Sequence, residues 1–204
     1  MLHLFHRMLK NYTMRAIFLV LATAIFLSAG AQEASEAVNW MTFEEAVEKM
    51  KTEKRKIFID VYTDWCGWCK VMDKNTFSEA TIAKLLNEKF YAVKFDAEQT
   101  ADVVFNGTTF KFVPHGSKGV HQLAAALLNN QLSYPNFVFL DEEFHIVPIY
   151  SGMTSVPGYK KPEEFHIFLS FVSEEGYKKV NINDYQKTYR SPYGQPPANP
   201  GQGR

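Results

Sequence analysis

The chain has 204 residues, of which 22 are basic and 22 acidic, and 46% are hydrophobic. That length and apolar content are enough to build the core of one domain. The balanced charge excludes the strongly basic surface by which proteins hold nucleic acid. The 2 cysteines allow one intramolecular bridge and exclude a disulfide framework.

Residues 1–31 have the pattern of a secretory signal peptide. Basic side chains precede an apolar run over residues 16–27, and small residues then offer a cleavage site after Ala31. The run is shorter than the about 20 residues that span a bilayer, which disfavours a transmembrane anchor. We therefore predict a periplasmic or secreted protein with no stable membrane anchor after cleavage.

The next elements are predicted to alternate between helices and strands. Thr42, with Glu45 three residues later, forms a capping box that predicts a first helix. The apolar residues 57–62 predict a buried strand, and residues 90–95 a second one after a helix that starts near residues 78–81. Because a helical crossover joins these two strands, we expect them to be parallel.

An insertion at about residues 99–120 interrupts this alternation. Asn106-Gly107 is the strongest short hairpin signal, so we predict an inserted β-hairpin over residues 102–113. Residues 115–119 are interpreted as a turn-rich link into a helix over residues 121–128.

The C-terminal part is predicted to complete the sheet and add helices. Pro162 suits the first turn of a long helix, and the residues from 191 to 204, rich in Pro and Gly, predict a disordered tail. The folded domain is then residues 32–190. The other predicted elements are a strand at 137–140, its hairpin partner at 144–150, and a short helical segment within 176–190.

The most informative motif is Cys66-Gly67-Trp68-Cys69, which stands where a predicted strand ends and a helix begins. The unpaired N–H groups and positive dipole end of a helix favour a thiolate, so Cys66 is the predicted nucleophile. Spacing i, i+3 puts Cys69 on the same helix face as Cys66, so Cys69 is the predicted resolving thiol. A structural bridge over so short a loop adds little stability. The motif therefore indicates redox chemistry by a Cys66–Cys69 disulfide without a further cofactor.

Other interpretations of the two cysteines stay open. Zinc needs four ligands, and the sequence has no second cysteine pair. A soft metal such as Cu(I) accepts two thiolates, although no cluster of Met or His supports it. A further alternative is that the protein is a non-catalytic binding or chaperone module whose cysteines stay oxidised. We predict no metal site.

Three further residues point to chemistry at this motif. Asp60 stands within an apolar strand; if buried, its carboxyl has a raised pKa and suits a group that accepts the proton of the resolving thiol. A solvated Asp60 without a role is the alternative. Trp65 and Trp68 flank Cys66 and are predicted to form a platform for an extended chain. Packing of Trp65 on the domain edge is the simpler interpretation of that residue.

These motifs, in this order, resemble the thioredoxin superfamily, and more narrowly its secreted bacterial members, over roughly residues 42–172. The best-matched segments are 58–70, 93–96 and 134–140. The resemblance implies a three-layer α/β/α fold with a central mixed sheet, to which the β-hairpin predicted from Asn106-Gly107 is an insertion. It also implies a cis peptide bond before Pro135, next to the cysteine pair.

The resemblance also implies roles for individual residues. Asp60 corresponds to the family's buried acid and Lys94 to a lysine near it, with a solvent-directed Lys94 as the alternative. The residues expected to contact a substrate are Trp65, Gly67, Trp68, Tyr134 and Pro135.

The implied activity is thiol–disulfide exchange on protein or peptide disulfides. A membrane-bound thiol reductase is the implied electron donor, and the reductase direction is favoured. The Gly-Trp pair between the cysteines differs from the Gly-Pro of reductases, the Gly-His of isomerases and the Pro-His of oxidases. The oxidase and isomerase directions therefore stay as alternatives. Tyr134 also differs from the small or β-branched residue of the better-known groups.

Overall fold

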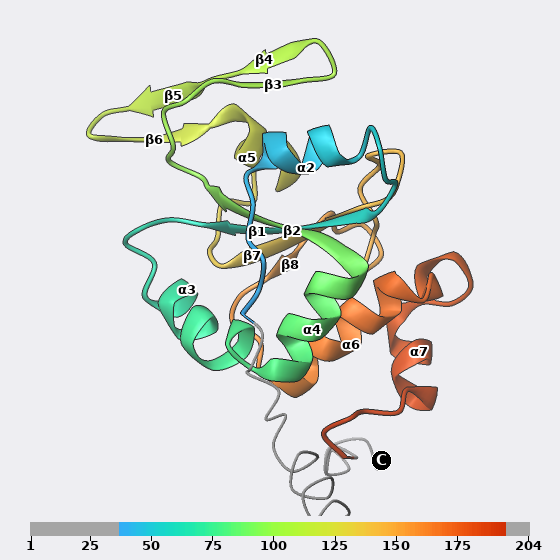
Figure 1. The fold of residues 1–204 in the computed structure, drawn as a ribbon. Coiled ribbons are helices and arrows are strands. Elements are labelled where there is room, and N and C mark those ends of the chain that lie inside the picture. Colours follow the sequence, from blue (N-terminus) through green and yellow to red (C-terminus); the bar gives the residue numbers. More distant parts are fainter. Residues whose placement is uncertain (1–36, 195–204) are drawn as a thin grey trace, which may run out of the picture. The chain divides into compact units, whose positions relative to one another are not determined.

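A computed structural model describes residues 37–194, in which a four-stranded sheet lies between helices (Figure 1). The strand order is β2-β1-β7-β8. Strand β1 pairs in parallel with β2 and antiparallel with β7, which pairs antiparallel with β8. The predicted α/β fold with a central mixed sheet is confirmed. The strands are β1 (Lys56–Tyr62), β2 (Phe90–Asp96), β7 (Asn136–Leu140) and β8 (Val156–Pro157).

Helices cover both faces of this sheet, as Figure 1 shows. Helix α6 begins with Pro162 in its first turn, and the predicted capping box of Thr42 and Glu45 opens α2. One face carries α2 (Phe43–Lys49) and α5 (Gln122–Leu127). The other face carries α3 (Gly67–Met72), its π-helical continuation η1 (Asp73–Phe77), α4 (Ala80–Lys89) and α6 (Pro162–Ser173), with η2 (Gly176–Lys178) and α7 (Ile182–Thr188) after it.

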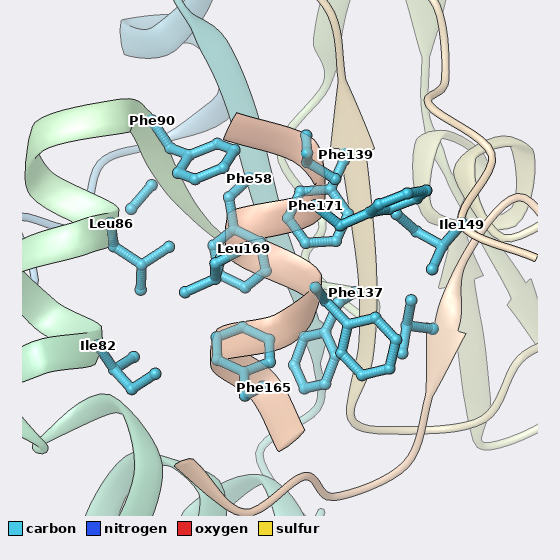
Figure 2. Packing of buried hydrophobic residues seen from close by; sticks show 14 of the residues in the cluster. Phe58, Ile82, Leu86, Phe90, Phe137, Phe139, Ile149, Phe165, Leu169 and Phe171 are labelled. Carbon is cyan, nitrogen blue, oxygen red and sulfur yellow. The ribbon is translucent and has the colours of Figure 1, made fainter. Parts of the chain in front are cut away.

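Strand β1 is buried on both faces, which explains its unbroken apolar run. On the face toward α4 and α6, the ring centre of Phe58 lies 5.4–5.9 Å from those of Phe137, Phe139 and Phe165 (Figure 2). Side chains of a strand alternate between faces, so Asp60 shares the face of Phe58. The apolar cluster on this face therefore surrounds the position of a carboxylate.

The insertion contains two hairpins where the sequence predicts one. Strands β3 (Val103–Phe105) and β4 (Thr108–Phe110) confirm the hairpin around Asn106-Gly107, whose φ angles of 48° and 75° suit its turn. The predicted link is wrong: it is a second hairpin of β5 (Phe112–His115) and β6 (Lys118–His121). Its two glycines and Pro114 resemble a loop in sequence, although they lie in and beside a short ladder.

The predicted hairpin partner of the strand at 137–140 is wrong in extent. Residues 144–150 make an isolated bridge from Ile146 to Leu140, and the strand that extends the sheet is β8. Pro148 lacks a backbone N–H and cannot donate to a ladder, which limits pairing in this segment.

The predicted signal peptide, residues 1–31, and residues 195–204 of the predicted tail lie outside the described residues. Residues 191–194 of that tail are described: the Tyr193 ring lies 5.9 Å from His166, and its hydroxyl donates to Glu79. The disorder of residues 191–204 stays a prediction. Within residues 37–194, no helix has the length and hydropathy needed to span a bilayer.

Candidate active site

Cys66 stands at the N-terminal cap of α3, in the loop that leaves β1. Its Sγ accepts the backbone N–H of Cys69 at 3.0 Å, and its own N–H donates to the Thr63 carbonyl at 3.0 Å. Cys66 and Cys69 form a disulfide with their Cα atoms 5.3 Å apart. The strand-to-helix position predicted for the motif is therefore the one that the structure shows.

The cysteines are buried, whereas the tryptophans beside them are exposed. Cys66 exposes 4% of its surface and Cys69 2%, against 59% for Trp65 and 61% for Trp68. The simpler interpretation expects Trp65 to be packed on the domain edge, but most of its surface is exposed. The two indole rings are therefore large exposed side chains beside a buried disulfide.

Contacts from distant segments hold both indole rings. Trp65 lies edge-on to Tyr134 with ring centres 6.0 Å apart, and its Nε1–H donates to Glu98 Oε2 at 3.0 Å. The ring of Trp68 lies 5.6 Å from that of Tyr159. Sequence reasoning missed Glu98 and Tyr159, because no local pattern brings them to the cysteines.

Lys118 and the β5–β6 hairpin border a cleft beside Trp65. Lys118 Nζ lies 5.3 Å from the centre of the Trp65 ring. The cleft, with a volume of about 490 Å³, is lined by Trp65, Glu98 and residues of the hairpin, including Phe112 and Pro114. The insertion therefore lies next to the candidate active site.

The other three expected substrate contacts are Tyr134, Pro135 and Gly67. The Tyr134–Pro135 peptide bond is cis, and the Pro135 carbonyl accepts the Gly158 N–H at 2.8 Å. Burial, together with the Glu98 and Asp96 carboxylates, raises the pKa of Tyr134 to about 12, so its phenol is neutral at ordinary pH. Gly67 faces open space, since a Cβ there would have no neighbour within 4 Å.

Asp60 is fully buried on the sheet face that α3 covers, and it pairs with Lys94. The parallel register places the two residues opposite each other, and Lys94 Nζ lies 2.7 Å from Asp60 Oδ2. The contact has the geometry of an ion pair, and Asp60 Oδ1 has no hydrogen-bond donor among the described residues. Burial raises the pKa of Asp60 to about 6, against the opposing effect of the Lys94 ammonium.

Lys94 is held by more than Asp60. A second carboxylate, that of Asp73, forms an ion pair with the same ammonium. The Lys94 Nζ also lies 5.0 Å from the ring centres of Trp40 and Tyr62. The predicted alternative of a solvent-directed Lys94 is therefore not observed. Sequence reasoning missed Asp73, although its position four residues after Cys69 on a helix was an available signal.

Within residues 37–194, no group of three or more His, Cys, Asp or Glu side chains is placed to hold a metal ion.

Comparison with known families agrees with this geometry. The family model Thioredox_DsbH, described as a protein of unknown function, DUF255, matches residues 19–174. The chain belongs to this family. It is accordingly a member of the thioredoxin superfamily, as its sequence motifs indicate.

Two curated proteins are similar to part of this chain. The uncharacterized protein B0495.5 of Caenorhabditis elegans is 32% identical over 122 residues, which cover 59% of this chain and 14% of that protein. The thiol:disulfide interchange protein DsbD of Colwellia psychrerythraea is 30% identical over 80 residues, 36% of this chain and 13% of DsbD. The chain thus spans a small part of these curated relatives.

A solved structure described as DsbH oxidoreductase is also similar in fold. It shares 17% identity with this chain, covers 76% of it and 94% of its own length, and superposes with a TM-score of 0.47.

Proposed function

We propose that this protein is a thiol–disulfide oxidoreductase that acts on protein or peptide disulfides, in the reductase direction. The observation that carries the proposal is the Cys66–Cys69 disulfide at the start of α3, with the buried carboxylate of Asp60 on the sheet face that this helix covers. Membership of the Thioredox_DsbH family and the similarity to a thiol:disulfide interchange protein support it.

The first step is attack by Cys66 on a substrate disulfide. The unpaired N–H groups and the dipole of the helix favour the Cys66 thiolate. Its sulfur bonds to one substrate sulfur, the substrate S–S bond breaks, and the other substrate sulfur leaves as a thiolate. Trp65 and Trp68, both exposed, supply apolar contact area for the substrate chain at this stage.

The second step closes the bridge. The Cys69 thiol gives its proton to Asp60, and the resulting thiolate attacks Cys66 Sγ. The Cys66–Cys69 bond forms as the bond to substrate breaks, and the substrate leaves reduced by two electrons in all. Because the pKa of Asp60 is about 6, this carboxylate is ionised at neutral pH and able to take the proton.

Regeneration requires an outside thiol that reduces the Cys66–Cys69 disulfide. We assign this role to a membrane-bound thiol reductase and place the reaction in the periplasm. The pattern of residues 1–31 supports that location. No metal or additional cofactor takes part in the proposed cycle.

A trapping experiment tests the proposal. Cys69→Ser removes the resolving thiol, so a substrate that reacts with Cys66 stays bound as a mixed disulfide. We expect this variant to accumulate covalent adducts that dithiothreitol releases, while the matched variant Cys66→Ser accumulates none. Equal trapping by the two variants would show that the protein does not exchange disulfides in this way. The same conclusion would follow if Cys69→Ser traps nothing although a thiol titration shows that its Cys66 is free. Binding that persists without either cysteine would instead indicate a non-catalytic module.

A further inference from the structure

The buried ion pair of Asp60 and Lys94 has a third member, Asp73, which has no role in the proposed reaction. Lys94 Nζ contacts two carboxylates, that of Asp60 at 2.7 Å and that of Asp73. Asp60 is buried, whereas 48% of the Asp73 side chain is exposed. The three residues therefore form a continuous charged chain from the sheet interior to the surface.

The position of Lys94 in this chain is fixed by aromatic rings. Its ammonium lies 5.0 Å from the ring centres of Trp40 and Tyr62, and 5.3 Å from that of Phe77. These rings come from three different segments, so Lys94 has little freedom to follow one carboxylate and leave the other. The ammonium therefore stays beside both carboxylates.

Asp73 also belongs to the helix that carries the reacting sulfurs. It follows Cys69 by four residues, and its backbone N–H donates to the carbonyls of Cys69 and Lys70. Helical spacing places positions i and i+4 one turn apart on the same side. The surface carboxylate and the resolving cysteine are thus held by one rigid turn.

We infer that Asp73 is a positioning residue for thiol–disulfide exchange. By sharing the Lys94 ammonium with Asp60, it keeps the buried carboxylate able to accept the proton of the Cys69 thiol, and it connects the buried ion pair to solvent. This inference rests on the proposed function and adds a residue to its second step.

The electrostatic reason is the division of one positive charge between two negative ones. With Asp73 present, Lys94 stabilises the Asp60 carboxylate less than it would alone, and the negative charge of Asp73 raises the pKa of Asp60 further. The ionisable groups around Asp60 are Lys94 from β2, Asp73 from the end of α3 and the phenol of Tyr62 on β1. Burial raises the pKa of the Tyr62 phenol, so this phenol stays neutral at the pH values at which Asp60 titrates.

The test isolates the second step. Reduced protein is mixed with excess bis(2-hydroxyethyl) disulfide, and tryptophan fluorescence follows closure of the bridge. At high disulfide concentration the rate becomes first order and reports displacement by Cys69. For the natural protein we expect this limiting rate to fall as the pH drops through about 6, where Asp60 becomes protonated.

Asp73→Asn leaves Lys94 to Asp60 alone, so the carboxylate holds its proton less tightly. We expect the midpoint of the pH profile to move down by at least about half a pH unit, with a lower plateau because a weaker base accepts the proton. Asp73→Glu keeps a carboxylate within reach of Lys94 and should restore the natural midpoint. Asp64→Asn, at an exposed carboxylate outside this ion-pair chain, is the matched control and should not move it.

Two results would overturn the inference. One is an Asp73→Asn profile with the midpoint of the natural protein; the other is an equal shift in Asp64→Asn, which would mark a general effect of surface charge. If the natural protein is not oxidised by the disulfide at any pH, the proposed function itself fails. That outcome differs from the failure of this inference alone, in which the protein is active but its pH profile is the same with and without the Asp73 carboxylate.

Discussion

Asp60 is a carboxylate at a position where the fold favours an apolar side chain. It lies on the face of β1 occupied by Phe58, and 1% of its side chain is exposed. Burial disfavours its charged form, and Lys94 offsets only part of that effect, so the pKa is raised to about 6. A carboxyl group that titrates near neutral pH is able both to accept and to release a proton, which suits the proposed role.

This raised pKa predicts a characteristic dependence of stability on pH. In the unfolded chain the pKa of Asp60 is near the ordinary value of 3.8, and in the folded protein it is about 6. The folded state therefore binds the proton more tightly, and its stability falls as the pH rises from about 4 through about 6. Asp60→Asn cannot ionise, so in the oxidised form it should be more stable than the natural protein at pH 7, by on the order of 2 kcal/mol.

Urea unfolding at a series of pH values measures this effect. The advantage of Asp60→Asn should shrink below about pH 6 and vanish only below about pH 3, where the natural carboxyl is protonated in both states. Asp64→Asn, at an exposed position, should follow the natural protein within about 0.5 kcal/mol at every pH. Parallel curves for Asp60→Asn and the natural protein would contradict a raised pKa at Asp60.

The β5–β6 hairpin shows how a close packing contact determines an element that sequence patterns miss. Gly119 lies against the ring of Phe112, and a Cβ on Gly119 would stand 2.1 Å from Phe112 Cζ. In the sequence, Gly119 suggests a loop. In the structure a glycine is needed there because the Phe112 ring of β5 covers this point of β6. Both residues also line the cleft beside Trp65, so this contact shapes the surface next to the disulfide.

A double-mutant cycle tests that contact. Gly119→Ala forces the Phe112 ring to move, and we expect a loss of about 1–3 kcal/mol in the free energy of unfolding. In Phe112→Ala the ring is absent, so adding Gly119→Ala to it should cost much less. Urea unfolding followed by circular dichroism measures all four proteins. Costs that simply add would show that the ring does not lie on the glycine.

The helices and hairpins with strong local signals were predictable. The capping box at Thr42, Pro162 at the start of α6 and Asn106-Gly107 each act within a few residues, so their structures follow from local sequence. Strand β8 has two residues, and its pairing with β7 depends on tertiary packing. A strand of two residues is too short to show the alternation of apolar and polar residues by which a strand is predicted.

For the molecule as a whole, the order of helices and strands and the cysteine motif were enough to predict a thioredoxin-like fold. The same information located Asp60 and the two tryptophans near the cysteines. The partners that complete the site come from distant segments: Glu98 holds Trp65 and Tyr159 packs on Trp68. Such contacts depend on how β2, the insertion and β8 meet around the sheet, which the local sequence does not specify.

The proposed activity requires that the Cys66–Cys69 pair be a reversible two-electron couple in the folded protein. Equilibrating the protein with glutathione or dithiothreitol buffers, with tryptophan fluorescence and thiol trapping as readouts, gives its reduction potential. We expect a single reversible transition near the thioredoxin value of about −270 mV, as a reductase requires. A value near −120 mV would reverse the direction of electron flow and indicate an oxidase. The absence of any reversible transition would contradict thiol–disulfide exchange at these cysteines.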